Sequence, residues 1–241
     1  MYNICYCLGY FTSDEEAASW ANQKKVCDNI VTPRAGDLKF KDQGVQDGKI
    51  DKGQETLDDP GDLVRIGNSS VRLPYSLDLT FAWNNFDLNV FFQGVGKRDF
   101  YPGAECAIFW GPYNRWYNPV WKHLEGNYWT EDNPDAYFPR LRAYMSNTVN
   151  NELGVPNTKY LQDASYLRLK TLTLGYTIPA KITDKVGLAK VRMFFSGQNL
   201  LTFTKLYKCF DPEAINNLNN NGAGFVYPIQ RIMTFGLDVN F

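Results

Sequence analysis

The acidic stretch KDQGVQDGKID, residues 41–51, is the segment best suited to holding a metal ion. Calcium prefers oxygen ligands, and an acidic calcium loop carries a glycine at its sixth position. With Gly48 at that position Asp47 is at the fifth, but the first and third positions lack the expected carboxylates. Asp47 and Asp51 are therefore candidate ligands of a weak Ca²⁺ site at 42–51, and a simple Gly/Asp turn is the alternative.

The remaining reactive residues predict no catalytic chemistry. His123 is the only histidine, so no Ser/His/Asp or Cys/His arrangement can be argued. No pair of carboxylates is placed to support a hydrolase. The cysteines are odd in number and match no zinc spacing, so we interpret them as small hydrophobic residues; they are Cys5, Cys7, Cys27, Cys106 and Cys209. The sequence therefore predicts a protein that is not an enzyme.

Aromatic residues crowd one segment, which includes WGPYNRWYNPVW. Flat aromatic faces can stack on sugar rings or pack against a protein partner. The alternatives are that the segment packs on itself or joins an interfacial belt of aromatic side chains. The candidate residues for contact with a substrate or partner are Trp110, Tyr113, Trp116, Tyr117, Trp121 and Trp129.

Composition narrows the class of protein. The chain has 241 residues and a formal net charge of −1, so no basic excess indicates nucleic-acid binding. Mean hydropathy is −0.39, and no apolar run approaches the roughly 18 residues of a spanning helix. That test does not detect a membrane β-strand, which alternates apolar and polar residues. Near the N-terminus, Ser13 and Glu16 have the spacing of a helix capping box.

Period-2 alternation predicts long antiparallel strands. PYSLDLTFAW and FDLNVFFQG alternate in phase across Asn84-Asn85, which predicts a hairpin with a tight turn. In SYLRLKTLTLGYTIP the apolar residues change from odd-numbered to even-numbered positions. A bulge near Lys170–Thr171 would keep both sets on one face of the sheet. Strands follow in KVRMFFSGQNLLTF, where Phe194 interrupts the polar face, and at about 227–241.

The connections alternate between short and long. The short ones are 84–85 and 179–189, and the long ones are 95–162 and 204–226. An outer-membrane barrel has this connectivity, with tight turns on one side and long external loops on the other. The strands of a soluble sandwich would also alternate apolar and polar residues, with the apolar face packed against a second sheet. Connectivity and strand length favour the barrel.

Six segments occur in a characteristic order. They are GDLKFKDQGVQDGKID, DDPGDLVRIGNSSVRLPYSLDLTFAWNNFDLNVFFQGVGKRDFY, ASYLRLKTLTLGYTIP, VRMFFSGQNLLTFTK, FDPE and a terminal strand ending in Phe241. Together they resemble the C-terminal part of the SusC/RagA family of TonB-dependent outer-membrane transporters. The resemblance covers nearly the whole chain.

The resemblance implies an all-β fold, a transmembrane antiparallel β-barrel of about 22 strands with a plug in its lumen. Residues 1–241 would supply C-terminal strands of that barrel, and 95–162 a long external loop. The implied function is import of large nutrients, glycans or peptides, across the outer membrane of a Gram-negative bacterium. The implied partners are a SusD-like surface lipoprotein, the TonB complex, the barrel-assembly machinery and outer-membrane lipid.

The resemblance also assigns the terminal strand as the signal read by the assembly machinery. An unpaired edge strand with an apolar face is a template for strand addition, which gives this assignment a physical basis. The signal residues would be Phe235, Leu237, Val239 and Phe241, while Asp238 and Asn240 would face the lumen.

The resemblance implies that a signal peptide, a TonB box and a plug precede the barrel, and none of them is recognisable in these 241 residues. We expect that Met1 lies inside a longer reading frame or that the chain is a truncated product. The roughly six to eight predicted strands could not close such a barrel, and open edges in lipid leave backbone groups unsatisfied. We therefore expect the isolated chain not to transport.

Two questions stay open at this stage. Arg168, Lys170 and Arg192 fall on strands, where they could attract an anionic substrate to the lumen or form salt bridges; we prefer salt bridges. The competing function is a soluble all-β carbohydrate-binding module that uses its aromatic segment. Cell fractionation separates the two functions, because a barrel needs detergent and a soluble module does not.

Overall fold

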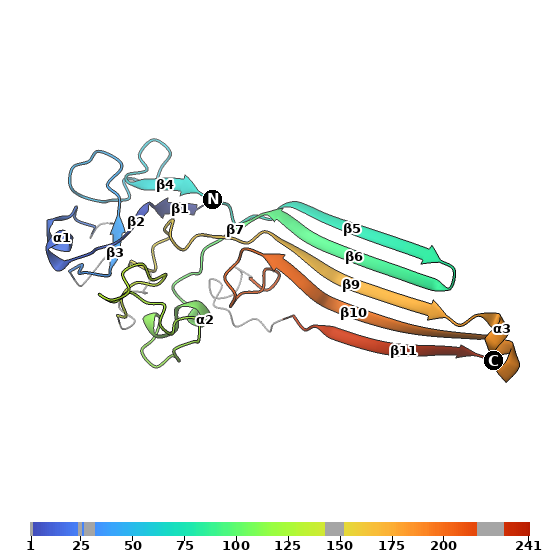
Figure 1. The fold of residues 1–241 in the computed structure, drawn as a ribbon. Coiled ribbons are helices and arrows are strands. Elements are labelled where there is room, and N and C mark those ends of the chain that lie inside the picture. The colour runs from blue at the N-terminus through green and yellow to red at the C-terminus, as the bar shows by residue number, and fades with distance from the viewer. Residues whose placement is uncertain (1, 24–25, 27–31, 143–151, 216–228) are drawn as a thin grey trace.

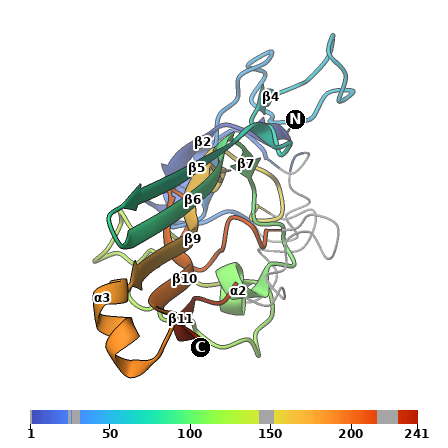
Figure 2. The same ribbon diagram turned by 90° about the vertical axis from the view of Figure 1, so that its right-hand side faces the viewer.

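The computed structural model describes residues 2–23, 26, 32–142, 152–215 and 229–241, and it has two parts (Figures 1 and 2). A long, narrow antiparallel sheet extends away from a compact head. The head is built from the N-terminal segment together with the long connection between two of the sheet strands. The predicted all-β fold class is confirmed, since helices in the described residues are few and short.

Five strands form the sheet in the order β11-β10-β9-β6-β5. Every neighbouring pair is antiparallel. The strands are β5 (Arg72–Trp83), β6 (Phe86–Lys97), β9 (Tyr166–Thr177), β10 (Lys190–Thr204) and β11 (Ile232–Asn240). Four of them have at least 12 residues, about twice the usual strand length in soluble proteins.

The register places the alternating residues of all five strands in common rows. Because successive side chains of a strand point to opposite faces, one slip of register would exchange the faces. One apolar row consists of Phe81, Leu88, Leu174, Phe195 and Phe235. The neighbouring polar row consists of Thr80, Asn89, Thr173, Ser196 and Thr234. The sheet therefore has one apolar face and one polar face.

The bulge predicted near Lys170–Thr171 is confirmed. Phe91 faces Thr171 but the next residue, Phe92, faces Leu169, so Lys170 is an extra residue on β9. The pairing of β9 with β10 shifts at the same level, next to Asn199 with its φ of 53°. This single shift keeps the leucines on both sides of Lys170 on the apolar face.

The predicted hairpin turn is also confirmed. Asn84 has a φ of 52°, in the left-handed region that asparagine tolerates, and the strands on either side pair up to Trp83 and Phe86. The other short connection contains α3 (Ala180–Thr183) and the 3₁₀ helix η3 (Asp184–Val186). Among the described residues, no helix is both long enough and apolar enough to cross a membrane.

The head consists of short elements around one aromatic core. Three two-stranded sheets pair β1 (Tyr2–Cys5) with β4 (Leu63–Ile66), β2 (Cys7–Tyr10) with β3 (Leu38–Phe40), and β7 (Asp99–Phe100) with β8 (Gln162–Asp163). The helices are α1 (Asp14–Ser19), α2 (Ala107–Trp110) and the 3₁₀ helix η1 (Gly111–Tyr113).

The core of the head is dominated by stacked and edge-on rings. Trp110, Tyr113, Phe138 and Tyr160 are fully buried. Trp110 lies edge-on to Tyr160 with ring centroids 5.0 Å apart, and Tyr113 stacks on Phe138 at 6.2 Å. Polar atoms of these rings have partners: Trp110 Nε1 donates to the Gly103 carbonyl at 3.0 Å, and the Tyr113 hydroxyl donates to the Pro139 carbonyl at 2.5 Å. The head thus resembles the interior of a soluble domain.

The predicted connection 95–162 is folded into this head. β6 ends at Lys97 and β9 begins at Tyr166, and the residues between them supply β7, β8, α2 and η1. The segment therefore packs on itself and on the N-terminal strands. Its external position stays a prediction.

Candidate membrane-facing surface and its junction with the head

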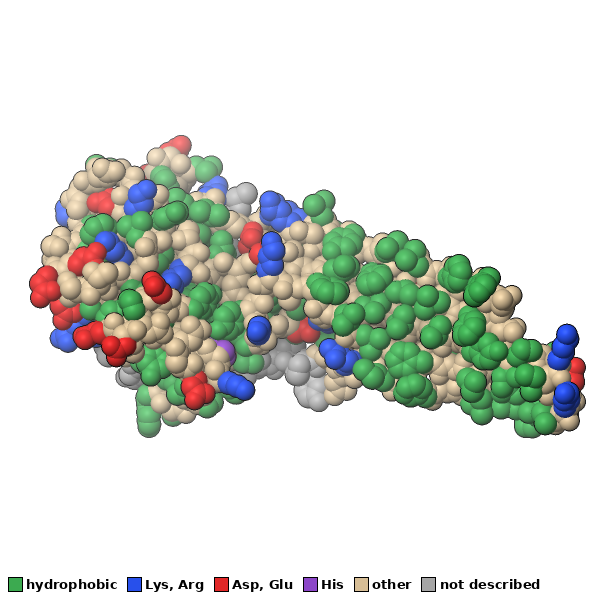
Figure 3. Space-filling model, viewed as in Figure 1, with side chains coloured by type: hydrophobic (Ala, Val, Ile, Leu, Met, Phe, Trp, Pro, Cys, Tyr) green, Lys and Arg blue, Asp and Glu red, His purple; other side chains and the backbone are tan. Residues whose placement is uncertain are grey.

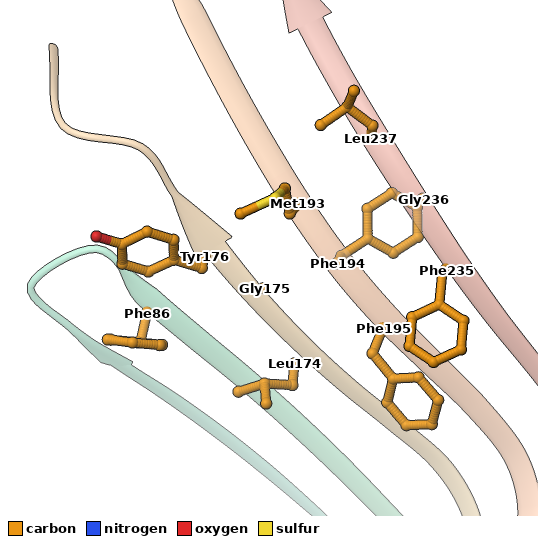
Figure 4. Close-up of a pocket in the computed structure, with 10 residues that line it drawn as sticks. All are labelled: Phe86, Leu174, Gly175, Tyr176, Met193, Phe194, Phe195, Phe235, Gly236 and Leu237. Carbon is orange, nitrogen blue, oxygen red and sulfur yellow. The ribbon is translucent and has the colours of Figure 1, made fainter. Parts of the chain in front are cut away.

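Most of the apolar face of the sheet is exposed, with Leu169 and Val191 as buried exceptions. Phe81 is 60% exposed, Trp83 65% and Phe235 81%. In Figure 3 apolar side chains form a broad band over the strands, with polar and backbone atoms visible between them. Figure 4 shows a shallow hollow in this band, to which β6, β9, β10 and β11 all contribute. Its apolar lining includes Phe86, Leu174, Tyr176, Met193, Phe195 and Leu237.

Within the described part of the chain, no second sheet covers this face. Monomeric soluble proteins rarely expose a contiguous apolar patch larger than a few hundred Å². A sandwich in which the stripe meets an opposing sheet is therefore not what these strands form. The apolar side chains face the surroundings of the molecule, as they do in a barrel wall.

The polar face carries an ion pair that crosses an intervening strand. Arg192 on β10 reaches over β9 to Asp87 on β6, with Nε 3.0 Å from Oδ1 and Nη2 2.5 Å from Oδ2. Gly175 of β9 lies beneath the pair, where a Cβ would be 2.3 Å from Asp87 Oδ1. Arg192 Nη1 is also 3.6 Å from Asp238 on β11. One arginine thus links three strands, and only glycine leaves room for it.

Phe194 interrupts the polar face as predicted, and a second glycine accommodates it. A Cβ at Gly236 of β11 would lie 2.2 Å from Phe194 Cζ. The Arg192 guanidinium lies 5.2 Å from the Phe194 ring centroid, within cation–π range. The aromatic ring therefore lies across the neighbouring strand beside the charged cluster.

A buried polar network joins the sheet to the head. Arg168 on β9 is 2% exposed; its Nη2 donates to Asp211 Oδ2 at 2.7 Å, and its Nη1 is 3.1 Å from Glu213 Oε2. Its Nε donates to Thr202 Oγ1 at 2.9 Å. Lys170 Nζ lies 2.9 Å from Glu213 Oε2. We call these four charged residues, Arg168, Lys170, Asp211 and Glu213, the latch.

The latch holds the segment that follows β10 against the polar face. Asp211 and Glu213 belong to the FDPE motif. Phe210 of the same motif stacks on Phe109 of the head core at 5.5 Å and lies edge-on to Phe100 at 5.1 Å. The motif therefore contacts the sheet through its acids and the head through its ring.

The latch and the Arg192 pair agree with the preferred interpretation of the strand cations. Arg168, Lys170 and Arg192 all have carboxylate partners within 4 Å. These carboxylates already occupy the positions that an anionic substrate would need. Salt bridges between strands and loops account for the three side chains.

The aromatic segment is divided between the core and the surface. Trp110 and Tyr113 are fully buried, so for them the packing alternative holds in the described structure. Trp116 and Tyr117 are 70% and 66% exposed and lie edge-on to each other at 5.5 Å. Trp121 is 40% exposed. Trp129 is partly buried, and its ring covers Gly36 so closely that a Cβ there would lie 2.3 Å from Cε3.

The carboxylates of the candidate calcium loop bind local backbone groups. Asp47 Oδ1 accepts from the Lys49 N–H at 2.9 Å, and Asp51 Oδ1 accepts from the Gly53 N–H at 3.0 Å. Across the described ranges, no group of three or more His, Cys, Asp or Glu side chains converges as metal ligands would. The calcium site stays a prediction.

The cysteines of the described residues are unpaired thiols in the head. Burial raises the pKa of Cys5, Cys106 and Cys209 to about 12. Since the thiolate is the reactive form, this favours their interpretation as small hydrophobic residues. Cys27 lies outside the described residues.

The terminal strand forms one edge of the sheet. β11 pairs with β10 on one side only, and β5 forms the opposite edge. Phe235, Leu237 and Phe241 are strongly exposed, and Val239 is half-buried opposite Val191. The sequence pattern predicted this stripe, whereas the role of the strand as an assembly signal stays a prediction.

Sequence analysis alone missed the latch and the glycine beneath Arg192. Asp211 and Glu213 are more than 40 residues from Arg168 in the sequence, so nothing local signals their contact. Gly175 and Gly236 offered a usable signal, since glycine within a strand often marks close approach of other atoms.

Two curated relatives come from Formosa agariphila. TonB-dependent receptor P26 is 27% identical over 243 residues, which cover 96% of this chain and 22% of the receptor. TonB-dependent receptor P3 is 32% identical over 184 residues, covering 73% of this chain and 17% of the receptor. The chain therefore spans about a fifth of the length of these relatives. No family model matches the sequence.

Solved structures show the same fold. The RagAB peptide importer in its "closed-closed" state matches all of this chain and 23% of the solved chain, at 23% identity and a TM-score of 0.59. A further RagAB peptide transporter structure matches 99% of this chain and 23% of its own, at 24% identity and a TM-score of 0.58. The open sheet and the head together thus match the fold of about a quarter of each solved chain.

Proposed function

Because the chain belongs to the SusC/RagA family of TonB-dependent receptors, we propose that its sheet is a section of the barrel wall of an outer-membrane nutrient importer. The chain spans about a fifth of the length of its curated relatives. The observation that supports this most directly is the exposed apolar face shared by five antiparallel strands. The polar face would look into the lumen, and the head would lie on the external side.

The dimensions suit a membrane. A strand of 12 residues at about 3.3 Å per residue is about 40 Å long. Tilted by about 45° it spans about 28 Å, close to the hydrocarbon thickness of about 30 Å. Both edges of the sheet lack a partner among the described residues, so further strands are needed to close a wall.

The substrate class in this proposal is glycans or peptides. Trp116, Tyr117 and Trp121 are the best-placed aromatic residues to contact a substrate or a SusD-like surface lipoprotein, because their rings are open to solvent. Trp129 is a weaker candidate, and Trp110 and Tyr113 would first have to leave the core. Energy would come from the TonB complex, and the assembly machinery would act on β11.

Fluorescence quenching by lipid tests the membrane assignment. Trp83 is the only tryptophan on the sheet, and it lies on the apolar face. When the chain is refolded with vesicles whose acyl chains are brominated, Trp83 emission should be quenched and the protein should float with the lipid. A Trp83→Phe variant should lose the quenched component.

The competing function makes the opposite prediction. A soluble carbohydrate-binding module would stay in the aqueous fraction, and brominated lipid would quench neither wild type nor Trp83→Phe. That result would overturn the barrel-wall proposal.

A further inference from the structure

The turn between β9 and β10 carries a charged and apolar surface at the end of the sheet remote from the head. α3 and η3 form this turn, and the C-terminus lies beside it (Figure 1). In Figure 3 the band of apolar side chains ends there, and the tip carries Lys/Arg side chains with an acidic side chain between them. The last complete apolar row before the tip consists of Trp83, Phe86, Tyr176, Met193 and Leu237.

The side chains of the turn are amphipathic. Ile182 and Val186 are 58% and 69% exposed, and their four-residue spacing puts them on one side of the helical turn. Lys181 and Lys185 have the same spacing and are exposed. Thr183 is buried and donates from its hydroxyl to the Ala180 carbonyl at 3.3 Å, a bond within the helical turn itself.

The cations of the turn form no close ion pair in the described structure. Lys181, Lys185 and Lys190, at the start of β10, have no carboxylate within 4 Å in the described ranges, although Lys190 interacts electrostatically with Asp87 of β6. Asp184 is the only acid within the turn itself. Asp238, on the adjacent β11, is engaged with Arg192. A positive surface therefore directly follows an apolar band.

We propose that this turn anchors the sheet to anionic lipid headgroups. The proposal rests on the barrel-wall function, because the band above the turn must lie in acyl chains. Ile182 and Val186 would lie at the boundary between chains and headgroups, while Lys181, Lys185 and Lys190 would extend to the lipid phosphates. Lysine suits this position because its long apolar stem can lie along the band while its ammonium group stays hydrated.

Partition into vesicles of two compositions tests the anchor. Each Lys near an anionic surface contributes roughly a five-fold gain in affinity at moderate ionic strength. The wild-type chain should thus bind vesicles containing 30% phosphatidylglycerol on the order of 100-fold more tightly than pure phosphatidylcholine vesicles. Lys181→Gln/Lys185→Gln/Lys190→Gln should lose most of this gain.

Two matched variants separate the anchor from general charge effects. Lys41→Gln/Lys122→Gln/Lys208→Gln removes three exposed lysines from the head, and it should keep the gain. Replacing the tip lysines by arginine should also keep it. Inorganic phosphate added at constant ionic strength should not compete, because the ligand is the lipid surface.

The outcomes are distinct from those of the barrel-wall proposal. If Trp83 is quenched by brominated lipid but the tip variant retains the full gain, the anchor is wrong and the barrel wall stands. If the head and tip variants lose the gain equally, the anchor is also wrong. If no form enters either vesicle, the barrel-wall proposal itself fails.

Discussion

The head and the sheet use the same large apolar residues in opposite ways. The head buries Trp110, Tyr113 and Phe138 completely, whereas the sheet leaves Trp83 and Phe235 largely exposed. A soluble domain gains stability by removing such side chains from water. Among the described residues no protein layer covers the apolar face of the sheet, which agrees with the proposed contact with lipid.

Polar groups show the same division. In the head, buried polar atoms find partners inside the protein, as when the Tyr101 hydroxyl donates to the Leu153 and Val155 carbonyls at 3.0 Å. On the sheet, polar side chains gather on one face and form bonds across strands, such as Asn89 Nδ2 to Asp78 Oδ1 at 2.8 Å. The comparison teaches that one chain contains a unit with an enclosed aromatic core and a sheet with an exposed apolar face, which is the face proposed to contact lipid.

Truncating one tryptophan in each region gives the largest contrast. Trp110→Ala leaves a cavity in a close-packed core and should lower the stability of the head by about 3–5 kcal/mol. Trp83→Ala removes an exposed ring and should leave the head unchanged. Native-state hydrogen exchange of the detergent-solubilised chain, read separately in head and sheet peptides, measures both. Equal losses of protection in the head would contradict the two-part description.

An arginine placed on each face of β9 tests the sheet itself. Leu172 lies on the apolar face and Thr173 on the polar face, next to each other near the middle of the sheet. In a bilayer, Leu172→Arg should cost about 2–4 kcal/mol, as arginine does on the lipid side of a barrel near the midplane. Thr173→Arg should cost much less. Urea unfolding from lipid vesicles compares them, and reversed costs would assign the faces the other way.

The latch is expected to give a smaller effect at the boundary of the two regions. Arg168→Met leaves Asp211 and Glu213 with Lys170 as their remaining charged partner, and should release segment 205–215 at a cost of about 2–3 kcal/mol. Exchange of amides in that segment measures the release. Lys205→Met is the control, since Lys205 is 82% exposed and its ammonium is 3.8 Å from Asp163.

A compensating variant makes this test sharper. In Arg168→Met/Asp211→Asn/Glu213→Gln the two partly buried acids are replaced by neutral amides, so less protection should be lost than in Arg168→Met alone. Greater loss in the triple variant would show that the latch acts through packing and hydrogen bonds rather than through charge.

The sheet was predictable from sequence because its determinants are local. Period-2 alternation identified the hairpin around Asn84 and the phase change at Lys170, and both hold in the structure. A bulge is visible in the sequence because the leucines before it occupy odd-numbered positions and those after it occupy even-numbered positions. The bounds of β6 and β9 also follow closely from where the alternation ends.

The head was far less predictable because its contacts join distant segments. Nothing near Trp110 in the sequence shows that it meets Tyr160, so the pattern could not separate it from the exposed Trp116. The same holds for Arg168 and Asp211. Local sequence patterns define strands and turns, whereas contacts between loops depend on the tertiary fold, which brings distant segments of the sequence together.

The smallest expected effect concerns the start of α1 in the head. The Ser13 hydroxyl accepts from the Glu16 N–H at 3.1 Å, and Glu16 Oε2 accepts from the Thr12 N–H and hydroxyl, each at 2.7 Å. Glu16 thus reaches one residue further back than a simple capping box requires. Lys39 Nζ lies 2.5 Å from Glu16 Oε1, and this hydrogen bond, with those from Thr12, lowers the pKa of Glu16 to about 2.

A lowered pKa fixes the sign of the pH dependence. The stabilisation from Glu16 is complete above the pKa of an unfolded glutamate, about 4.3, and is lost as pH falls toward 2. Glu16→Gln should therefore lower the protection of α1 amides at pH 6 by about 1 kcal/mol, and the difference from wild type should shrink below pH 4. Glu15→Gln, one residue earlier in the same turn, should have a smaller effect. A wild-type-like α1 in Glu16→Gln at pH 6 would mean that packing within the head, and not these hydrogen bonds, holds α1 in place.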